Sequence, residues 1–559
     1  MLSSVYSYLF RSGATPSTSS REYSTNNPVI PTAMANTFHP RLRSIFLQLD
    51  AIAPRFVLNK GDIDILTSPE SFYNTLKQKI TAAQSRVFLS TLYIGKHQTE
   101  LMDVIDEALT ANEDLKVYIL TDALRGTREA PEAPCSASLL VPLVEKHGKH
   151  RIDIRMYHTP HLAGFTKHLA PKRINEGWGL QHMKLYGFDN EIMLSGANLS
   201  QDYFTDRQDR YYVFKNKLLT DYYFRIHEAV SLLSYQVLPS SKLVQGFRLD
   251  WPTANKSCEP HMNLHRFISD SSYLLDPILK QHNLTAFDEY KDTDDFDTIV
   301  YPVSQFTPLF PDKNDRSTEK PAILRLLSFL DSPSIKWWFT AGYFNMLPQI
   351  QDRLINGKAE GTVITASPKA NSFYKSAGVS YYLPEAYLLF AKKFLEEVYK
   401  VGKSSMIKVY EWQNGIVNTV GGWSYHAKGL WITVPEETEP SITVIGSSNY
   451  TKRAYSLDLE SNAIVITKDP ELKSLMKSEI ENLMKHVSPL ELHDFKPKSK
   501  TVAEVPIGEN AGEVVDTVAT IEENSDEAKV NNKVIYEIDD DRKISYGVHL
   551  AVKLLGGKL

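Results

Sequence analysis

Two patterns of hydrophobic and polar positions, one typical of strands and one of helices, take turns along this chain. Short runs rich in β-branched and aromatic residues, bounded by Gly, Asp or Asn, predict strands. In the first half of the chain these runs cover 85–95, 115–123, 151–157, 182–189 and 191–198. Amphipathic stretches lie between such runs; the one after Ser68 has Pro69 at its first helical position, and another covers 383–400. Strands that alternate with helices predict an α/β architecture.

The series of strand-like runs recurs about 250 residues further along the chain. The second set covers 334–345, 361–368, 405–412, 425–434 and 441–449. This internal repeat predicts two similar lobes. We assign 38–245 to the first lobe, 246–300 to a connecting segment and 301–492 to the second lobe.

The N-terminal segment has the composition of a mitochondrial transit peptide. Eight of the first 24 residues are serine, the only acid among them is Glu22, and apolar residues from Leu2 to Phe10 recur at helical spacing. A matrix-protease site after Tyr23 would make residues 1–23 the transit peptide. The alternative is a disordered tail without a targeting role.

The C-terminal region divides into a polar and an apolar part. Residues 500–532 carry eight acids, so we expect an acidic disordered linker over 493–532. The tail, 533–559, ends in an apolar stretch from Ile544 that includes Lys553 and Lys558. Such a stretch either lies on a membrane surface or docks on the fold.

Composition excludes several classes of protein. With 62 basic and 67 acidic residues the net charge is -5, which argues against nucleic acid as the main partner. The two cysteines, Cys135 and Cys258, are too few for a disulfide framework or a four-thiolate zinc site, and favour a reducing compartment. No run of 18 apolar residues is present, so no membrane-spanning helix is expected.

The two halves share a set of polar residues at matching positions. The first half has His182, Lys184, Asp189, Asn198 and Asp209; the second has His426, Lys428, Asn449 and Glu460. Each asparagine follows a glycine closely and precedes the last acid of its set by 11 residues. A third His-x-Lys, at His147, lacks the downstream residues and is interpreted as a surface loop. The repetition of the whole set is therefore the specific signal.

These residue types suit phosphoryl chemistry without a metal. His and Lys two positions apart on a strand emerge on one face, so two such strands can bring both pairs together between the lobes. The lysines and the asparagines would bind phosphate oxygens. One imidazole can attack phosphorus to form a phosphohistidine while the other protonates the departing oxygen. Asp209 and Glu460 are the candidates to orient the imidazoles.

The constellation resembles the phospholipase D superfamily, whose signature is H-x-K-x4-D followed by G-x-N, present twice. The resemblance covers about residues 40–490. The second copy departs from it, because Thr433 stands where the signature has Asp. It also has 20 residues from His426 to Gly446, against 14 from His182 to Gly196. Asp189 is thus a candidate whose catalytic role is in question.

The wording around the motifs looks like that of the eukaryotic mitochondrial phosphatidylglycerophosphate synthases. The matching segments are YHTPHLAGF (157–165), GLQHMKLYGFD (179–189), SGANLSQDYFTDRQDRY (195–211), TAGYFN (340–345) and YHAKGLW (425–431). The resemblance implies transfer of the phosphatidyl group from CDP-diacylglycerol to sn-glycerol 3-phosphate. It also implies a peripheral enzyme at the matrix face of the mitochondrial inner membrane. The oligomeric state stays open.

For that reaction His182 is expected to be the nucleophile and His426 the general acid and then base; the reverse assignment stays open. The acceptor is a dianion, so further cations are expected near the site. The candidates are Arg207, Arg210, Lys452 and Arg453. No cofactor is required, although a divalent cation could bridge the substrate pyrophosphate.

Two other functions compete with the transferase. A hydrolytic phosphodiesterase of the same superfamily, either a phospholipase or a nuclease, would use water as the acceptor. A catalytically inactive membrane-associated scaffold would keep only the fold, but it would not need two intact His-Lys pairs. Spacing cannot separate a transferase from a hydrolase, since they share the phosphohistidine step.

Overall fold

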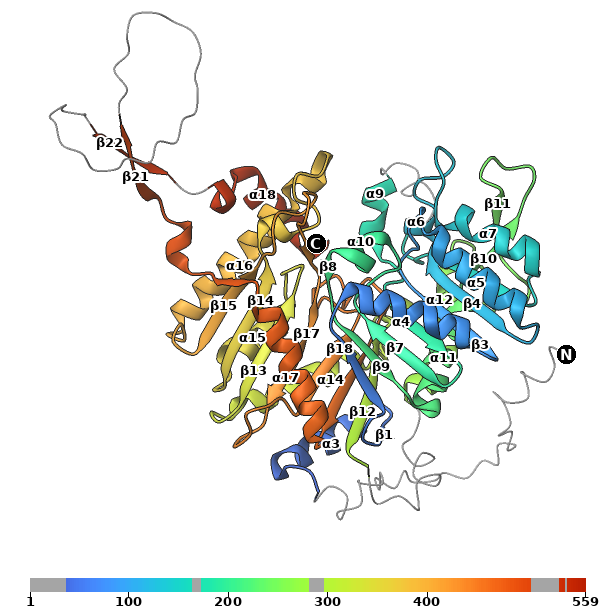
Figure 1. The fold of residues 1–559 in the computed structure, drawn as a ribbon, viewed down its shortest axis with the longest axis horizontal. Coiled ribbons are helices and arrows are strands. Elements are labelled where there is room, and N and C mark those ends of the chain that lie inside the picture. Colours follow the sequence, from blue (N-terminus) through green and yellow to red (C-terminus); the bar gives the residue numbers. More distant parts are fainter. Residues whose placement is uncertain (1–36, 163–171, 281–295, 504–531, 538–539, 559) are drawn as a thin grey trace, which may run out of the picture.

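The computed structural model describes residues 37–162, 172–280, 296–503, 532–537 and 540–558. The predicted transit peptide lies outside these residues, as does most of the predicted acidic linker. Two α/β lobes stand side by side, each built on one large sheet (Figure 1). The predicted fold class is confirmed.

The first lobe is built on a mixed sheet that, within the described residues, has nine strands. Their order across the sheet is β11 (Phe247–Asp250), β10 (Tyr235–Pro239), β5 (Ile152–Tyr157), β4 (Lys116–Asp122), β3 (Arg86–Ser90), β6 (Leu185–Phe188), β7 (Glu191–Ser195), β9 (Tyr211–Phe214) and β2 (Ile63–Leu66). Strands β3, β4 and β5 are parallel, and the other pairings are antiparallel. All five strands predicted for this half are present.

The second sheet repeats the topology of the first. Among the described residues its order is β1 (Phe56–Leu58), β12 (Thr298–Gln305), β19 (Glu460–Thr467), β18 (Ile442–Gly446), β17 (Lys428–Thr433), β13 (Lys336–Ala341), β14 (Glu360–Ala366), β15 (Ile407–Trp412) and β20 (Val487–Pro489). From β12 to β20 the strands correspond one to one with β2, β9, β7, β6, β3, β4, β5 and β10 of the first sheet. The repeat seen in the sequence is therefore a repeat of structure.

The start of the folded chain packs on the lobe that comes later in sequence. Strand β1 pairs with β12, and helix α3 (Arg43–Asp50) buries Ile45 and Leu49 in the core of the second lobe. The predicted range of the first lobe, 38–245, is therefore corrected at its beginning: α3 and β1 belong to the second lobe. Sequence order predicted the wrong neighbour because the apolar face of α3 carries no signal for which sheet covers it.

Helices and sheets form three buried layers. An outer layer of the first lobe contains α4 (Pro69–Ala82), α5 (Thr99–Ala111) and α7 (Ser136–His147). An outer layer of the second lobe contains α3, α14 (Glu319–Leu327), α15 (Pro348–Asn356) and α16 (Leu383–Lys400). The layer between the sheets contains α11 (Lys217–Ser231), α12 (Leu264–Leu279) and α17 (Pro470–Met484), together with strand residues of both lobes. The shared layer makes the lobes one folding unit.

Shorter elements connect these layers. The short α-helices are α6 (Ala123–Gly126), α9 (Lys172–Asn175) and α10 (Gln201–Thr205), and β8 (Arg207–Gln208) pairs in parallel with β16 (Ser424–Tyr425) across the lobes. The 3₁₀ turns are η1 (Pro40–Leu42), η2 (Glu176–Trp178), η3 (Thr307–Leu309), η4 (Ser328–Asp331), η5 (Pro368–Ala370), η6 (Gly378–Tyr382), η7 (Leu492–Phe495), η8 (Asp540–Arg542) and η9 (Gly556–Lys558).

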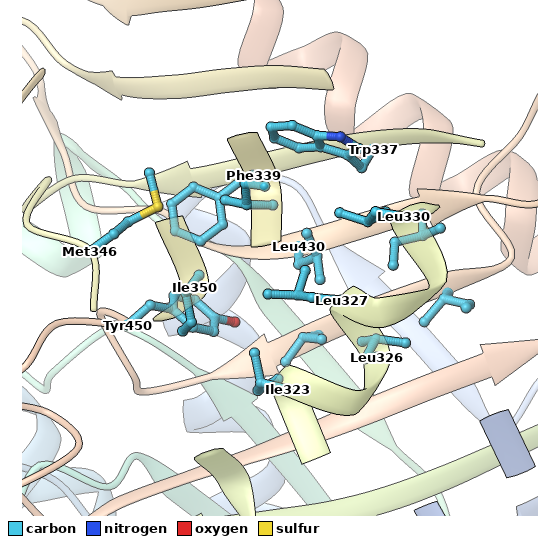
Figure 2. Packing of buried hydrophobic residues seen from close by; sticks show 14 of the residues in the cluster. Ile323, Leu326, Leu327, Leu330, Trp337, Phe339, Met346, Ile350, Leu430 and Tyr450 are labelled. Atoms are coloured by element: carbon cyan, nitrogen blue, oxygen red, sulfur yellow. The ribbon is translucent and has the colours of Figure 1, made fainter. Parts of the chain in front are cut away.

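Local sequence explains where the helices begin and which face they bury. Ser68 accepts a hydrogen bond from the Ser71 N–H and starts α4 with Pro69 in its first turn, as predicted. In the second lobe, leucines of α14 and η4 pack on Trp337 and Phe339 of β13 (Figure 2). Trp337 is 1% exposed and is a core residue of this lobe.

The C-terminal region differs in part from the predicted linker and tail. Phe495, in η7, is buried in the second lobe, and β21 (Lys498–Ala503) pairs with β22 (Asn532–Glu537). The first part of the predicted 493–532 linker is therefore structured. Helix α18 (Tyr546–Leu555) follows and packs on α16. No helix in the described parts of the chain combines the length and the hydropathy needed to cross a bilayer.

Each lobe contains one glycine that lies under an aromatic ring of the neighbouring strand. The Phe88 ring covers Gly187 of β6, and the Trp337 ring covers Gly361 of β14; in both places a Cβ atom would overlap the ring. We expect Gly187→Ala to lower the free energy of unfolding by about 1–3 kcal/mol, because the Phe88 ring must shift in a packed core. Denaturant unfolding measures the change.

Gly177→Ala is the matched control, since a Cβ there meets open space. It should change the free energy of unfolding by less than about 0.5 kcal/mol. Equal effects of the two substitutions would contradict the steric explanation.

Candidate active site

Both His-Lys pairs lie where their chain segments enter a strand at the junction of the lobes. His182 and Lys184 precede β6, His426 precedes β17 and Lys428 is the first residue of β17. The pairs were predicted inside strands; three of the four residues instead lie just before one. The backbone N–H of each histidine donates to a backbone carbonyl of the opposite lobe. That of His182 donates to Leu459 O at 2.9 Å, and that of His426 donates to Gln208 O at 2.9 Å.

Each imidazole is paired with a carboxylate of the other lobe. His182 Nδ1 lies 2.9 Å from Glu460 Oε1, and His426 Nδ1 lies 2.7 Å from Asp209 Oδ2. Both carboxylates have side chains that are 0% exposed. The two acids predicted to orient the imidazoles are thus in place, but the partners are exchanged between the lobes. A carboxylate at Nδ1 favours the tautomer that carries the proton there and leaves Nε2 for chemistry. At His426, Lys428 Nζ also lies 2.8 Å from Nδ1.

The lysines are buried among these groups. Lys184 Nζ donates to the carbonyl oxygen of His182 at 2.7 Å, and Lys428 Nζ lies 3.5 Å from Asp209 Oδ2. Burial, before all other causes, lowers the pKa of Lys184 to about 7 and also lowers the pKa of Lys428. The two ammonium groups further disfavour each other's charge. An anion between them would favour the charged form of both.

The histidines and acids are shifted toward their neutral forms as well. Burial, and then the charge of the neighbouring lysine, holds the pKa of His182 and of His426 well below the usual range. Burial raises the pKa of Glu460 to about 7 and raises the pKa of Asp209. Neutral imidazoles keep a free lone pair on Nε2, which is the form a nucleophile or a general base requires.

Differences between the lobes appear at the two asparagines. Asn198 is satisfied by protein: its Oδ1 accepts from the Leu92 N–H at 3.2 Å, and its Nδ2 donates to Tyr203 Oη at 3.1 Å. It therefore positions Tyr203 with one of its two Nδ2 hydrogens, and its contact with a phosphate oxygen stays a prediction. Asn449 Oδ1 is buried without a hydrogen-bond partner in the described part of the chain.

Tyr203 is a site residue that the sequence did not indicate. Its hydroxyl lies 3.3 Å from His426 Nε2, and its ring packs edge-on against that imidazole. Tyr343 packs against the same imidazole, also edge-on, with 5.3 Å between the ring centroids. Tyr203 follows Asn198 by only five residues, but a lone tyrosine in an aromatic-rich segment carries no distinguishing pattern.

Ser447 and Asp458 were missed as well. The Ser447 hydroxyl donates to Glu460, the carboxylate that holds His182. Asp458 accepts from the Leu180 N–H at 3.0 Å and pairs with Arg453 at 3.1 Å. Asp458 lies two residues before Glu460, so an acidic pair at the start of β19 was the available signal.

Asp189 does not belong to the site. It occupies the turn between β6 and β7, at the far end of β6 from His182. Its carboxylate accepts hydrogen bonds from the N–H groups of Gln84, Ser85 and Arg86 at 2.7–2.9 Å. Burial disfavours the charge, yet these bonds lower the pKa of the carboxyl group. Its prediction as a catalytic residue is corrected: it fastens a tight hairpin to the neighbouring strand.

This role explains why the second copy of the motif can lack the acid. There β17 ends at Thr433, and β18 begins at Ile442, so a longer loop replaces the tight turn. A longer loop has no need of a carboxylate that fastens it to the neighbouring strand. The missing Asp is therefore a consequence of hairpin length.

Arg210 is also corrected, from substrate binding to structure. Its guanidinium is buried against the Trp431 ring and pairs with Glu479 through two nitrogens, at 2.8 and 3.0 Å. It also donates to Val444 O at 2.7 Å, across the lobe boundary. A fully committed guanidinium cannot bind an acceptor as well. Arg210 joins the lobes behind the site.

The other three predicted cations differ in their relation to the two histidines. Arg207 donates to Ser424 Oγ at 3.0 Å across the β8–β16 pairing, and its charge lowers the pKa of His426. Arg453 acts on the pKa of His182 in the same direction. Both therefore stay candidates for the acceptor dianion. Lys452 is exposed and lies against Gly557 of the C-terminal tail.

Two duplicated α/β lobes with a buried His-Lys pair from each define a phospholipase D-type protein. A solved structure agrees in fold: phosphatidylserine synthase of Haemophilus influenzae Rd KW20 has a TM-score of 0.59 at 17% identity and covers 80% of this chain and 91% of its own. No protein-family model matches the sequence.

Curated relatives are more specific. A Saccharomyces pastorianus protein is 53% identical over 449 residues, which is 79% of this chain and 85% of the relative. One from Schizosaccharomyces pombe is 40% identical (79% and 92%), and a human mitochondrial one is 30% identical (81% and 82%). All three are named CDP-diacylglycerol–glycerol-3-phosphate 3-phosphatidyltransferase. The chain belongs to this family, and the resemblance seen in the sequence is confirmed.

The placement of Asp189 generates a prediction about stability. We expect Asp189→Ala to lower the free energy of unfolding by about 1–3 kcal/mol, since several N–H groups lose a charged acceptor, while kcat stays unchanged. Asp209→Asn should instead affect catalysis: it should lower kcat by about 10²-fold or more, because the His426 tautomer is no longer held. Unfolding curves and initial rates on both variants separate the roles. A large loss of kcat in Asp189→Ala would return that residue to the site.

The lowered pKa of Lys184 predicts that kcat/KM falls as the pH rises above neutrality. The ammonium form binds phosphate and is lost as pH rises through about 7, so kcat/KM for the nucleotide lipid should fall above that pH. Lys184→Arg should move the fall to higher pH even if the maximum is lower, because a guanidinium keeps its charge. Lys149→Arg, at the unrelated His-x-Lys, is the control. A profile that stays flat well above neutrality in the unsubstituted enzyme would contradict this.

Proposed function

We propose that this chain transfers the phosphatidyl group of CDP-diacylglycerol to sn-glycerol 3-phosphate, with release of CMP, through a phosphohistidine on His182. Family membership supports the reaction. The arrangement of the two imidazoles supports the division of roles. The side chain of His182 is 11% exposed and that of His426 is 4% exposed. In the described residues no hydrogen bond to His182 Nε2 is found, whereas Tyr203 approaches His426 Nε2.

In the first half-reaction His182 Nε2 attacks the phosphorus that carries the diacylglycerol group. A P–N bond forms, and the bond from phosphorus to the bridging oxygen of the pyrophosphate breaks. That oxygen leaves with CMP, and His426 in its protonated form donates a proton to it. Glu460 stabilises the positive charge that develops on His182. Lys184 and Lys428 bind the non-bridging oxygens, and the anionic substrate favours the protonated His426 that the empty site disfavours.

In the second half-reaction His426 Nε2 takes the proton from a hydroxyl of sn-glycerol 3-phosphate. The hydroxyl oxygen attacks phosphorus, and the P–N bond to His182 breaks. Arg207 and Arg453 are proposed to bind the phosphate dianion of this acceptor, since each lies close to one of the imidazoles. These steps require no cofactor; a divalent cation, if bound with the substrate, would supply further positive charge at the pyrophosphate.

We further propose a mitochondrial location, with residues 1–23 as the transit peptide and peripheral contact with the matrix face of the inner membrane. The names of the vertebrate relatives, which include the word mitochondrial, support the location. The composition of the N-terminal segment supports it independently.

The test is CMP release by the purified protein in detergent, with and without sn-glycerol 3-phosphate, combined with labelling by CDP-diacylglycerol that carries radioactive phosphorus in the phosphate bearing the diacylglycerol group. We expect acceptor-dependent release. When the acceptor is withheld, label should remain on the protein, stable to alkali and labile to acid as a phosphohistidine is. His182→Ala should abolish both labelling and release. His426→Ala should slow turnover by about 10²-fold or more and still accept label.

His147→Ala is the matched control, because His147 belongs to the isolated His-x-Lys and pairs with Asp106 at the end of α7. It should behave as the unsubstituted protein does. Label on His182→Ala but not on His426→Ala would reverse the assignment of the histidines. Equal CMP release without the acceptor would make the protein a hydrolase.

A further inference from the structure

Helix α18 buries one face and leaves an apolar face in solvent. Val548 and Val552 are 3% and 6% exposed and pack on Ala386 and Leu389 of α16. On the opposite side Tyr546 is 84% exposed and Leu550 is 51% exposed. Residues four apart share a helix face, so these two side chains form one patch. The apolar tail therefore docks on the fold, which was one of the two interpretations of the sequence. It also presents apolar groups outward, so contact with a membrane surface stays a prediction.

The orientation of α18 is set by polar contacts at both of its ends. Before the helix, Arg542 donates to the buried carboxylate of Glu411 at 2.9 Å, and Asp541 pairs with Lys369 at 2.5 Å. After the helix, Asn345 Nδ2 donates to Gly556 O at 2.8 Å. With both ends held, the outward face is a defined part of the surface.

The C-terminal end of α18 is tied to a segment of the candidate active site. Asn345, which holds the end of α18, is two residues from Tyr343, whose ring packs on His426. Tyr387 of α16 stacks on Tyr343, with 5.3 Å between the ring centroids. A continuous set of aromatic rings thus leads from the catalytic imidazole to the helix on which α18 packs. In Figure 1 helix α18 lies beside α16.

Further exposed aromatic groups lie on η6, which contacts the same helix, α16, as α18 does. Tyr381 and Tyr382 are 56% and 51% exposed in η6, directly before α16. Lys553 of α18 and Lys452, which lies against Gly557, are exposed as well. Exposed aromatic and aliphatic groups together with lysines are typical of a surface that rests in the headgroup region of an anionic bilayer.

We propose that the outward face of α18, together with Tyr381 and Tyr382, is the surface by which this protein docks on a lipid bilayer. The inference rests on the proposed function, because a diacyl lipid substrate must pass from a bilayer to His182 and His426. Docking at this face brings the aromatic path from Tyr387 to Tyr343 next to the acyl region. Tyr387 and Tyr343 then offer aromatic contacts between the docked helices and His426.

The experiment compares the full chain with the double variant Tyr546→Ser/Leu550→Ser. The control is Tyr273→Ser/Leu475→Ser, which removes one exposed tyrosine and one exposed leucine from α12 and α17. Each protein is floated with vesicles of phosphatidylcholine, with and without an added anionic phospholipid. Turnover is then measured on long-chain CDP-diacylglycerol in vesicles and on a short-chain, monomerically dispersed CDP-diacylglycerol.

We expect the α18 double variant to lose vesicle binding and kcat/KM on vesicle substrate by about tenfold or more, since two apolar side chains no longer enter the interface. Its turnover of dispersed substrate should not change, and the control variant should match the unsubstituted protein in every assay. Added anionic phospholipid should strengthen the binding of the unsubstituted chain.

Unchanged flotation and vesicle turnover in the α18 double variant would overturn the docking surface. A dimer that light scattering detects without lipid, and that this variant converts to a monomer, would also overturn it, because the face would then be a contact between copies. Failure of the proposed function has a different signature. The unsubstituted protein would then bind vesicles through this face without acceptor-dependent turnover of either substrate.

Discussion

The structure depends on the exchange of imidazole partners between the lobes. Glu460 of the second lobe holds His182 of the first, and Asp209 of the first holds His426 of the second. Neither lobe alone therefore contains an oriented histidine. Any shift of one sheet against the other would separate a buried carboxylate from its partner, and that separation is costly. The shared apolar layer, the Arg210–Glu479 pair and the β8–β16 pairing all act against such a shift.

Burial of this charged cluster also determines its electrostatics. With two imidazoles, two lysines and two carboxylates away from water, each group is displaced toward its neutral form. These buried groups are poorly solvated, and the negative charge of a bound phosphate would stabilise the ammonium forms of the two lysines. Binding energy and proton uptake are then linked, because the substrate creates the protonation state in which the site works. A water-filled site with ordinary pKa values would have no such coupling.

The two lobes share one framework, but the surroundings of their two histidines differ. Asp189 fastens a short hairpin in the first lobe, and a longer loop after Thr433 makes that acid dispensable in the second. Asn198 is occupied by Tyr203, which approaches only one of the imidazoles. Residues at equivalent positions of the two lobes thus make different contacts. This asymmetry supports the proposed division of roles between the two histidines.

The sequence by itself determined the α/β class, the repeat, the strands and the polar residues that repeat with it. These features follow from local periodicity and from spacing along the chain. Only the tertiary structure decided the pairing of His182 with Glu460, the distance of Asp189 from the chemistry, the commitment of Arg210 to Glu479 and the packing of residues 38–58 on the later lobe. Each is a contact between segments far apart in sequence. Spacing reports which residues share an element, whereas the choice among distant partners depends on how the two sheets dock.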